Sequence, residues 1–203
     1  MKTLKKRLFA FTILVSLTHM PFSCTVDCGP FELLESTITE INAVVGTNDD
    51  GNFQEKASSN YAEASVRVFI SDMDLSELTL QNFNLINTAM ACSPPEPEPT
   101  QKINKIEISS DKIIYTQGKT FEVGTDLTEL FEVTDYYGRK SVSDFVTDQN
   151  SDLLLFGYFG AGVMFQLANQ PDSVVDQAFT FQFEFSDGKV LNAEVDRFFV
   201  ENE

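Results

Sequence analysis

An alternating run of phenylalanines near the C-terminus constrains the fold of this chain more than any other feature. From Phe179 to Phe185 every second residue is phenylalanine, and the residues between are Thr, Gln and Glu. This period of two predicts a strand with one buried face. The next residues, 186–189, read Ser-Asp-Gly-Lys, which is typical of a turn between two strands.

The length of that turn decides which residues face the phenylalanines across the hairpin. A two-residue turn would place polar and acidic residues of 192–196 opposite them, which is unfavourable for a buried stripe. A three-residue turn ending at a left-handed Gly188 instead places Leu191, Ala193 and Val195 there. We therefore predict an all-β fold, an antiparallel, immunoglobulin-like β-sandwich with one or two short helices.

Other segments support this class. The spacing of apolar residues predicts further strands over 31–45, 64–71, 102–109 and 163–167. The segment Thr125–Phe131 is typical of a short helix, in which Asp126 and Glu129 would form a capping box.

The N-terminus is typical of an export signal. Basic residues precede an apolar run over 8–17, and this run is shorter than the roughly 20 residues that a membrane-spanning helix needs. We predict cleavage after residue 23. Ser23-Cys24 resembles the lipobox of bacterial lipoproteins, so Cys24 is a candidate for acylation and anchoring at the outer membrane, with the protein periplasmic or surface-exposed. The alternative is plain secretion with Cys24 in a disulfide.

The cysteine count fits the lipidated alternative. The chain has three cysteines, and if Cys24 carries lipid, Cys28 and Cys92 remain as one pair. A Cys28–Cys92 disulfide would close a loop of about 65 residues, which corresponds to roughly 4 kcal/mol in the chain-entropy account. A bridge between Cys24 and Cys28 would constrain little.

The stretch 93–100 is rich in proline, and we expect it to be extended and free of strand pairing. We interpret it as a stiff crossover inside one sandwich domain, 24–203. The alternative is a linker between two small β domains, 24–92 and 101–203.

These motifs resemble a known family. The export signal with its cysteine, the second cysteine, Ala91-Cys92-Ser93-Pro94-Pro95 and the Gly-Thr-Asp-Leu-x-x-Leu-Phe segment at 124–131 are similar to a family of small lipoproteins of Gram-negative bacteria. That family is defined only as a domain of unknown function. The resemblance implies an envelope lipoprotein and no catalytic residues.

Charge narrows the possible partners. Residues 1–23 contain four of the fourteen basic residues and none of the thirty-one acidic ones, so residues 24–203 carry a formal charge of −21. Such a chain is unsuited to nucleic acid. An acidic, soluble surface is the simplest interpretation.

The residue types also limit the available chemistry. The single histidine, His19, lies in the export signal, so the exported chain has no imidazole for catalysis or for a metal. Asp148, Asn150 and Asp152 have the spacing of calcium ligands, but the glycine and the closing glutamate of such a loop are missing. We predict no cofactor.

A turn over 135–140 supplies the one candidate ligand surface. Tyr136, Tyr137 and Arg139 could contact a sugar ring or a peptide, and ordinary turn residues are the alternative. We therefore predict a non-catalytic envelope lipoprotein that binds or scaffolds an envelope protein or a polysaccharide. The competing hypothesis is a carboxylate-dependent glycan hydrolase, because acidic residues are plentiful.

Overall fold

The computed structural model describes residues 34–49, 52–56, 60–77, 97–135, 138–152 and 162–202. They belong to one compact unit, formed by residues 33–79 together with 96–203. No helix in this part of the chain is long and apolar enough to cross a lipid bilayer. The predicted export signal, 1–23, lies outside the described ranges.

Most of the described backbone is extended. The strands are β1 (Leu34–Asp49), β2 (Asn52–Gln54), β3 (Ala64–Glu77), β4 (Glu98–Pro99), β5 (Ile103–Ser110), β6 (Ile114–Thr116), β7 (Lys119–Phe121), β8 (Phe131–Asp135), β9 (Gly138–Ser141), β10 (Gly162–Leu167), β11 (Val175–Phe185) and β12 (Val190–Val200). A 3-10 helix, η1, spans Thr128–Leu130, and an α-helix, α2, spans Val142–Asp152.

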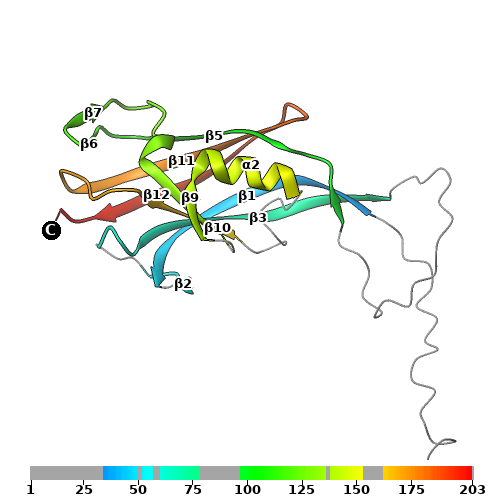
Figure 1. The fold of residues 1–203 in the computed structure, drawn as a ribbon, viewed down its shortest axis with the longest axis horizontal. Helices are drawn as coiled ribbons and strands as arrows, with labels where there is room; N and C mark the ends of the chain where they lie inside the picture. Colours follow the sequence, from blue (N-terminus) through cyan, green and yellow to red (C-terminus); the bar gives the residue numbers. More distant parts are fainter. Residues whose placement is uncertain are drawn as a thin grey trace, which may run out of the picture. The chain divides into compact units, whose positions relative to one another are not determined.

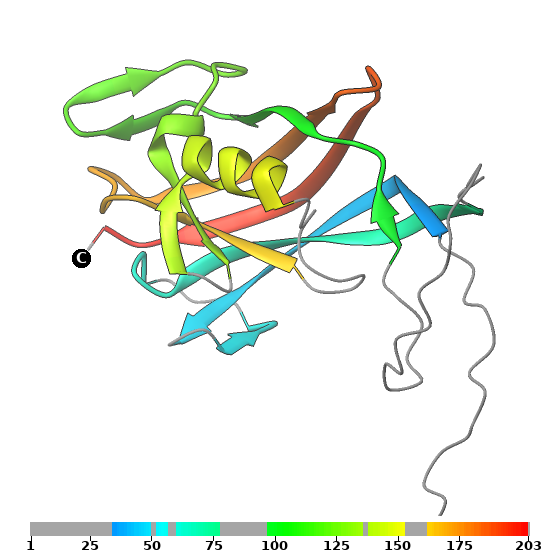
Figure 2. The same cartoon turned by 45° about the vertical axis from the view of Figure 1, so that its right-hand side comes forward.

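Two sheets form the body of the fold, as Figures 1 and 2 show. The first has the strand order β2-β1-β3-β10-β8-β9 with β4 paired to β1, and the second has the order β12-β11-β5. Strands β1 and β3 precede the proline-rich stretch, whereas β8, β9 and β10 follow it. A separate hairpin, β6–β7, completes the strands. The predicted class, an all-β, sandwich-like fold with a short helix, is confirmed.

Phenylalanine rings fill the space between the two sheets. Phe181 of β11 lies 5.0 Å from Phe165 of β10 and 6.0 Å from Phe131 of β8, measured between ring centroids. Phe179 meets Phe131 edge-on at 5.3 Å. All four rings are buried, and edge-on contacts are favourable for aromatic side chains. Since burying one such ring stabilises by roughly 1.5–3 kcal/mol, the alternating run supplies much of the core.

The β11–β12 hairpin has the predicted register. Phe181 lies opposite Ala193, and the flanking pairs follow the same register. Gly188 is left-handed, with φ of +85°. Its N–H donates to the carbonyl of Phe185, and the N–H of Phe185 donates to the carbonyl of Lys189, both at 2.9 Å. The three-residue turn is therefore confirmed.

The proline-rich stretch pairs with β1, so the prediction that it makes no strand pairing is wrong for its described part. Glu98 and Pro99 lie parallel to Glu35 and Ser36. The N–H of Thr100 donates to the carbonyl of Ser36 at 3.0 Å. In a strand only alternate residues donate toward one neighbour, so a proline at every second position leaves such pairing possible.

Two local predictions over 125–140 need correction. The predicted helix is only the 3-10 turn η1, and Asp126 accepts from the N–H of Thr128 at 2.9 Å rather than forming a capping box with Glu129. The predicted turn over 135–140 is mostly strand, because β8 and β9 pair as far as Asp135 and Gly138.

Helix α2 was not expected from the sequence. Ser141 caps it, since the N–H of Asp144 donates to the Ser141 hydroxyl oxygen at 3.1 Å and that hydroxyl donates to the Asp144 carboxylate at 2.7 Å. Val142 and Phe145 are buried, and the helix lies against β5, β8 and β9.

Candidate functional site

The β6–β7 hairpin is a tight structure with an uncommon turn. Its two central residues, Gln117 and Gly118, both have positive φ, 53° and 67°. This is the arrangement of a type I′ turn, whose twist matches that of the flanking strands. Glycine adopts it freely, whereas glutamine does so at a cost. The N–H of Gly118 donates to the Asp172 carboxylate at 2.7 Å, which holds the turn in place.

Hydrogen bonds fix one side of the hairpin to the start of β11. The N–H of Asp172 donates to the carbonyl of Tyr115 at 3.2 Å, and the N–H of Asp111 donates to the carbonyl of Ala178 at 3.3 Å. Asp111 also accepts from the N–H of Ala178 at 2.8 Å. Residues 111–116 therefore run antiparallel beside 172–178.

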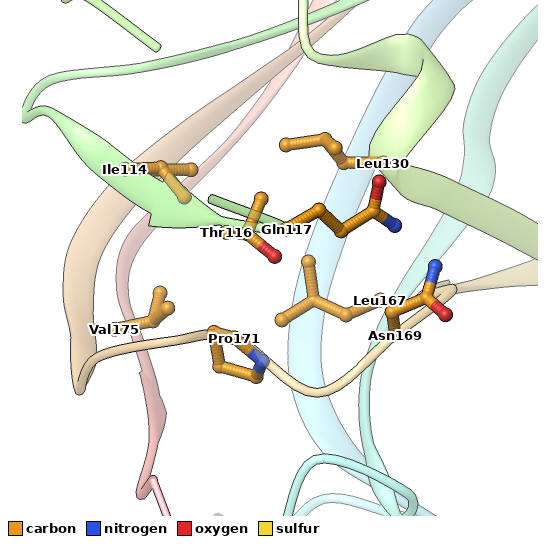
Figure 3. A pocket seen from close by; sticks show the side chains of 8 residues that line it. All are labelled: Ile114, Thr116, Gln117, Leu130, Leu167, Asn169, Pro171 and Val175. Atoms are coloured by element: carbon orange, nitrogen blue, oxygen red, sulfur yellow. The ribbon is translucent and has the colours of Figure 1, made fainter. Parts of the chain in front are cut away.

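The inner side of the hairpin covers a small cavity of about 10 Å³. Its lining residues come from the hairpin, from η1, from the end of β10, from the start of β11 and from the connection between these two strands. They are Ile114, Thr116, Gln117, Leu130, Leu167, Asn169, Pro171 and Val175. In Figure 3 the Gln117 side chain extends from the hairpin toward Leu130 and Asn169. The space suits about one water molecule and is far below the several hundred Å³ of a small-molecule site.

The outer side of this region carries exposed apolar side chains. Six large apolar residues are exposed among the described residues. Four of them are here, namely Ile113, Tyr115, Val123 and Val174, with exposed fractions of 40%, 49%, 58% and 56%. Ile113 and Tyr115 alternate with the buried Ile114, so they share the outward face. We call these four residues the apolar patch.

The patch lies far from the point where the chain enters β1. The turn that follows β11 contacts β1, because the Lys189 ammonium donates to the carbonyl of Ile38 at 3.0 Å. The other end of β11 lies beside the β6–β7 hairpin. The strand has 11 residues, which spans roughly 33–37 Å at about 3.3 Å per residue. We call the end with Lys189 and Ile38 proximal and the end with the hairpin distal (Figure 1).

Two carboxylates converge at a different place, beside α2. The Lys140 ammonium lies 3.1 Å from Oδ2 of Asp135 and 2.7 Å from Oδ2 of Asp148. The hydrogen bond to Asp148 is the main cause that raises the pKa of Lys140. The single positive charge of Lys140 offsets one of the two negative charges, and its contacts tie α2 to the β8–β9 hairpin. This arrangement is suited to joining elements rather than to protonating a substrate.

The residues with calcium-like spacing are engaged elsewhere. Asp148 binds Lys140, as above. Asn150 exchanges two hydrogen bonds of 2.8 Å with the backbone N–H and carbonyl of Ile103. Both residues belong to helix α2 and not to a loop. Within the described ranges no group of three or more His, Cys, Asp or Glu side chains is placed to hold a metal.

The predicted site residues fall in different parts of the chain. Cys24, Cys28, Cys92, Tyr136 and Tyr137 lie outside the described residues. Arg139 is described, and its guanidinium donates to the carboxylate of Glu132 and, at 3.1 Å, to the carbonyl of Leu167. These bonds hold Arg139 against the first sheet.

Residues 111–123, where the hairpin and most of the patch lie, carry no predicted element or site. The available signal was the apolar run Ile113-Ile114-Tyr115 ahead of Gln117-Gly118. A strand followed by a glycine turn of this kind predicts a hairpin. It does not say which apolar side chains remain exposed.

No family model, curated protein or solved structure matches this chain.

Proposed function

We propose that the protein is a non-catalytic lipoprotein of the cell envelope that binds another protein through its distal end. The observation that carries the proposal is the apolar patch. Isolated apolar residues are ordinary on protein surfaces, but four of the six that are exposed in the described part of the chain lie on or next to the β6–β7 hairpin. Hydrogen bonds join Asp172 to both Gly118 and Tyr115 and so tie that hairpin to the segment before β11, which lowers the cost of ordering it on binding.

An acyl group on Cys24 would anchor the protein at the outer membrane. Nine residues, 25–33, lie between that cysteine and Leu34 at the start of β1. Fully extended, the ten steps from Cys24 to Leu34 reach roughly 33–36 Å. The tether thus leads to the proximal end and leaves the distal end available to a partner in the periplasm or at the cell surface.

The chemistry of the patch favours a protein over a polysaccharide. Three of its members are the branched aliphatic residues Ile113, Val123 and Val174, and only Tyr115 is aromatic. Sugar rings stack on flat aromatic platforms, whereas aliphatic side chains pack against apolar protein surface. The formal charge of −21 disfavours nucleic acid.

Site-specific photocrosslinking in intact Gram-negative cells tests the binding function. A photoreactive phenylalanine analogue replaces Tyr115 in one variant and Asn192 in a matched control. Asn192 is exposed on the outer face of the second sheet, away from the hairpin. We expect discrete crosslinked products from position 115 and none from position 192. Equal crosslinking at both positions, or none at 115, would remove the support for a distal binding surface.

The anchor needs a separate test. The intact mass of the protein reports both acylation at Cys24 and a Cys28–Cys92 bridge. It is measured on membrane and soluble fractions, with and without reduction. We expect an acylated species that gains two mass units on reduction, and a Cys24→Ser variant in the soluble fraction. An unacylated wild-type protein would contradict the lipoprotein assignment.

A further inference from the structure

The outer edge of β7 has backbone groups that face away from the fold. In a hairpin with a two-residue turn, the residues that flank the turn exchange both hydrogen bonds, and the next pair exchanges none. Here Thr116 and Lys119 flank the turn, and Tyr115 and Thr120 form the next pair. The N–H and carbonyl of Tyr115 and of Thr120 therefore point outward. On the Tyr115 side the carbonyl accepts from the N–H of Asp172.

On the Thr120 side of the hairpin, no segment in the described part of the chain lies alongside in the way that Asp172 lies beside Tyr115. There β6 is the one strand that pairs with β7, and Thr120 is exposed. Figures 1 and 2 both show β7 on the outside of the molecule. Residue 122 follows with the same orientation as Thr120, and its carbonyl accepts from the N–H of Thr125 at 3.0 Å.

The edge strand β5 shows how the same fold covers an edge. Asn150 bonds both backbone groups of Ile103. The hydroxyl of Thr128 accepts from the N–H of Ile108 at 3.2 Å, and the N–H of Leu127 donates to the carbonyl of Ile108 at 2.7 Å. Proteins commonly protect edges in this way because an open edge pairs with other chains. The contrast marks β7 as an edge that is available for pairing.

We propose that the partner protein binds by adding an extended segment to the outer edge of β7. The inference rests on the proposed function and names the way in which the distal end would recognise its partner. Strand addition takes affinity from main-chain hydrogen bonds and specificity from alternate side chains. The N–H and carbonyl of Thr120 supply the bonds, and Tyr115, which lies across from Thr120 and belongs to the apolar patch, supplies apolar contact.

The neighbouring side chains define what the added segment should contain. Thr120 is small and lies across from Tyr115, so a large apolar side chain beside Thr120 would reach the tyrosine ring. Two positions along, the side chain would lie next to the exposed carboxylate of Glu122, which favours Lys or Arg. The segment is therefore a strand with a basic residue two positions from a large apolar one.

A second copy of this chain is a poorer occupant of the edge. Two copies would each bring a formal charge of −21, which opposes their association. The pairing of two three-residue strands would also bury far less than the roughly 1,000 Å² that a stable dimer needs. Charge complementarity instead favours a neutral or basic partner.

The test uses a blocked peptide, Ser-Thr-Ile-Thr-Arg-Thr-Ser, and a control peptide in which Glu replaces Arg. Each is added at about 1 mM to the folded, isotope-labelled protein, and amide exchange and chemical shifts are read by NMR. We expect the first peptide to shift the Thr120 and Glu122 amide signals and to slow exchange at Thr120 about tenfold. The control peptide should bind less tightly.

Two variants separate the edge from the patch. Thr120→Pro removes the outward N–H but no bond to β6, and proline is tolerated at such edge positions. It should weaken peptide binding about tenfold, whereas Thr120→Val, which keeps the N–H, should not. Unchanged chemical shifts of the core amides verify that each variant is folded.

The possible results are distinct. If Thr120→Pro binds the peptide as the wild type does, or if the peptide leaves the Thr120 amide unchanged, strand addition is overturned. Crosslinking from position 115 would then still support a distal binding surface. Protection of Thr120 that appears without peptide and grows with protein concentration would make a second copy the occupant and would also overturn the proposal.

Discussion

Gln101 should be one of the most sensitive polar positions in the fold, because its side chain joins β1 to the β11–β12 turn. Only 1% of Gln101 is exposed. Its Oε1 accepts from the N–H of Ile38, and its Nε2 donates to Oδ2 of Asp187, both at 2.7 Å. Ile38 lies on β1 two residues beyond the pairing with β4, so the amide side chain continues that line of hydrogen bonds.

The change to test is Gln101→Leu, which keeps the approximate size of the side chain and removes both bonds. The N–H of Ile38 would become a buried donor without an acceptor, which costs about 1–3 kcal/mol. Loss of the bond to Asp187 adds about 1 kcal/mol or less, because that carboxylate is exposed and solvent screens it. We expect a total loss of about 1–4 kcal/mol, a large share of the 5–15 kcal/mol that is typical for the free energy of unfolding.

Urea denaturation at pH 7 measures this loss. The transition midpoint should fall while the slope stays constant, since the surface exposed on unfolding is unchanged. The matched control is Gln182→Leu, because Gln182 is only half-buried and donates to the exposed Asn192 at 3.2 Å. That change should cost less than about 0.5 kcal/mol. Equal losses in the two variants would refute the role assigned to Gln101.

Three further predictions concern other parts of the fold. Hydrogen bonds to Asp187, chiefly from the N–H of Lys189, hold the pKa of its carboxyl below the ordinary value. A depressed pKa adds stability that is present above about pH 4 and is lost as the pH falls through the folded-state pKa. Asp187→Asn should therefore be less stable than the wild type at pH 7. In a series of denaturation experiments at decreasing pH, the free energies of unfolding of the two proteins should converge. In Gly162→Ala the new methyl group would lie 2.8 Å from the carbonyl oxygen of Val68, which cannot move without distorting β3, so thermal unfolding should show a loss of about 1–3 kcal/mol. Asn150→Ala removes both bonds to the edge of β5, and amide exchange along β5 should accelerate with a stability loss of about 1–3 kcal/mol; unchanged exchange there would contradict the edge-covering role.

The register of the β11–β12 hairpin was predictable because one-residue slips are costly. A slip would move every phenylalanine of β11 from the core to the solvent. The alternation from Phe179 to Phe185 and the glycine at 188 therefore agree on a single arrangement, and the structure has it. Local pattern and turn chemistry suffice where they point to the same answer.

Bulges explain why the buried face of β1 could not be predicted from the sequence. Its pairing with β3 shifts register around Thr39, so Ile38 is buried before the shift and Ile41 is buried after it. The inward positions thus change parity inside one strand. The same happens in β12, where Val195 and Phe198 are both buried across a shift. A strict period of two cannot describe a strand with an extra residue.

Helix α2 was missed for a different reason. Its mean composition is polar, and the spacing of Asp148, Asn150 and Asp152 resembles that of calcium ligands, whereas the signal for a helix is Ser141 at the N-cap position. Only a few of its residues are buried, so its apolar stripe is narrow. Side chains such as Asn150 hold it through hydrogen bonds to β5, and such tertiary contacts cannot be read from periodicity.

The exposed apolar residues at the distal end could not be predicted from periodicity either, and their exposure is the reason to assign them a function. Ile113, Ile114 and Tyr115 are consecutive apolar residues, a pattern typical of a strand buried on both faces. In the fold only Ile114 points inward, and Ile113 and Tyr115 remain exposed. About half of each residue stays in contact with water, at 40% for Ile113 and 49% for Tyr115, and that apolar surface is left unburied by folding. An exposed apolar surface beside an uncovered strand edge, on a hairpin that hydrogen bonds tie to Asp172, is what strand addition by a partner would use.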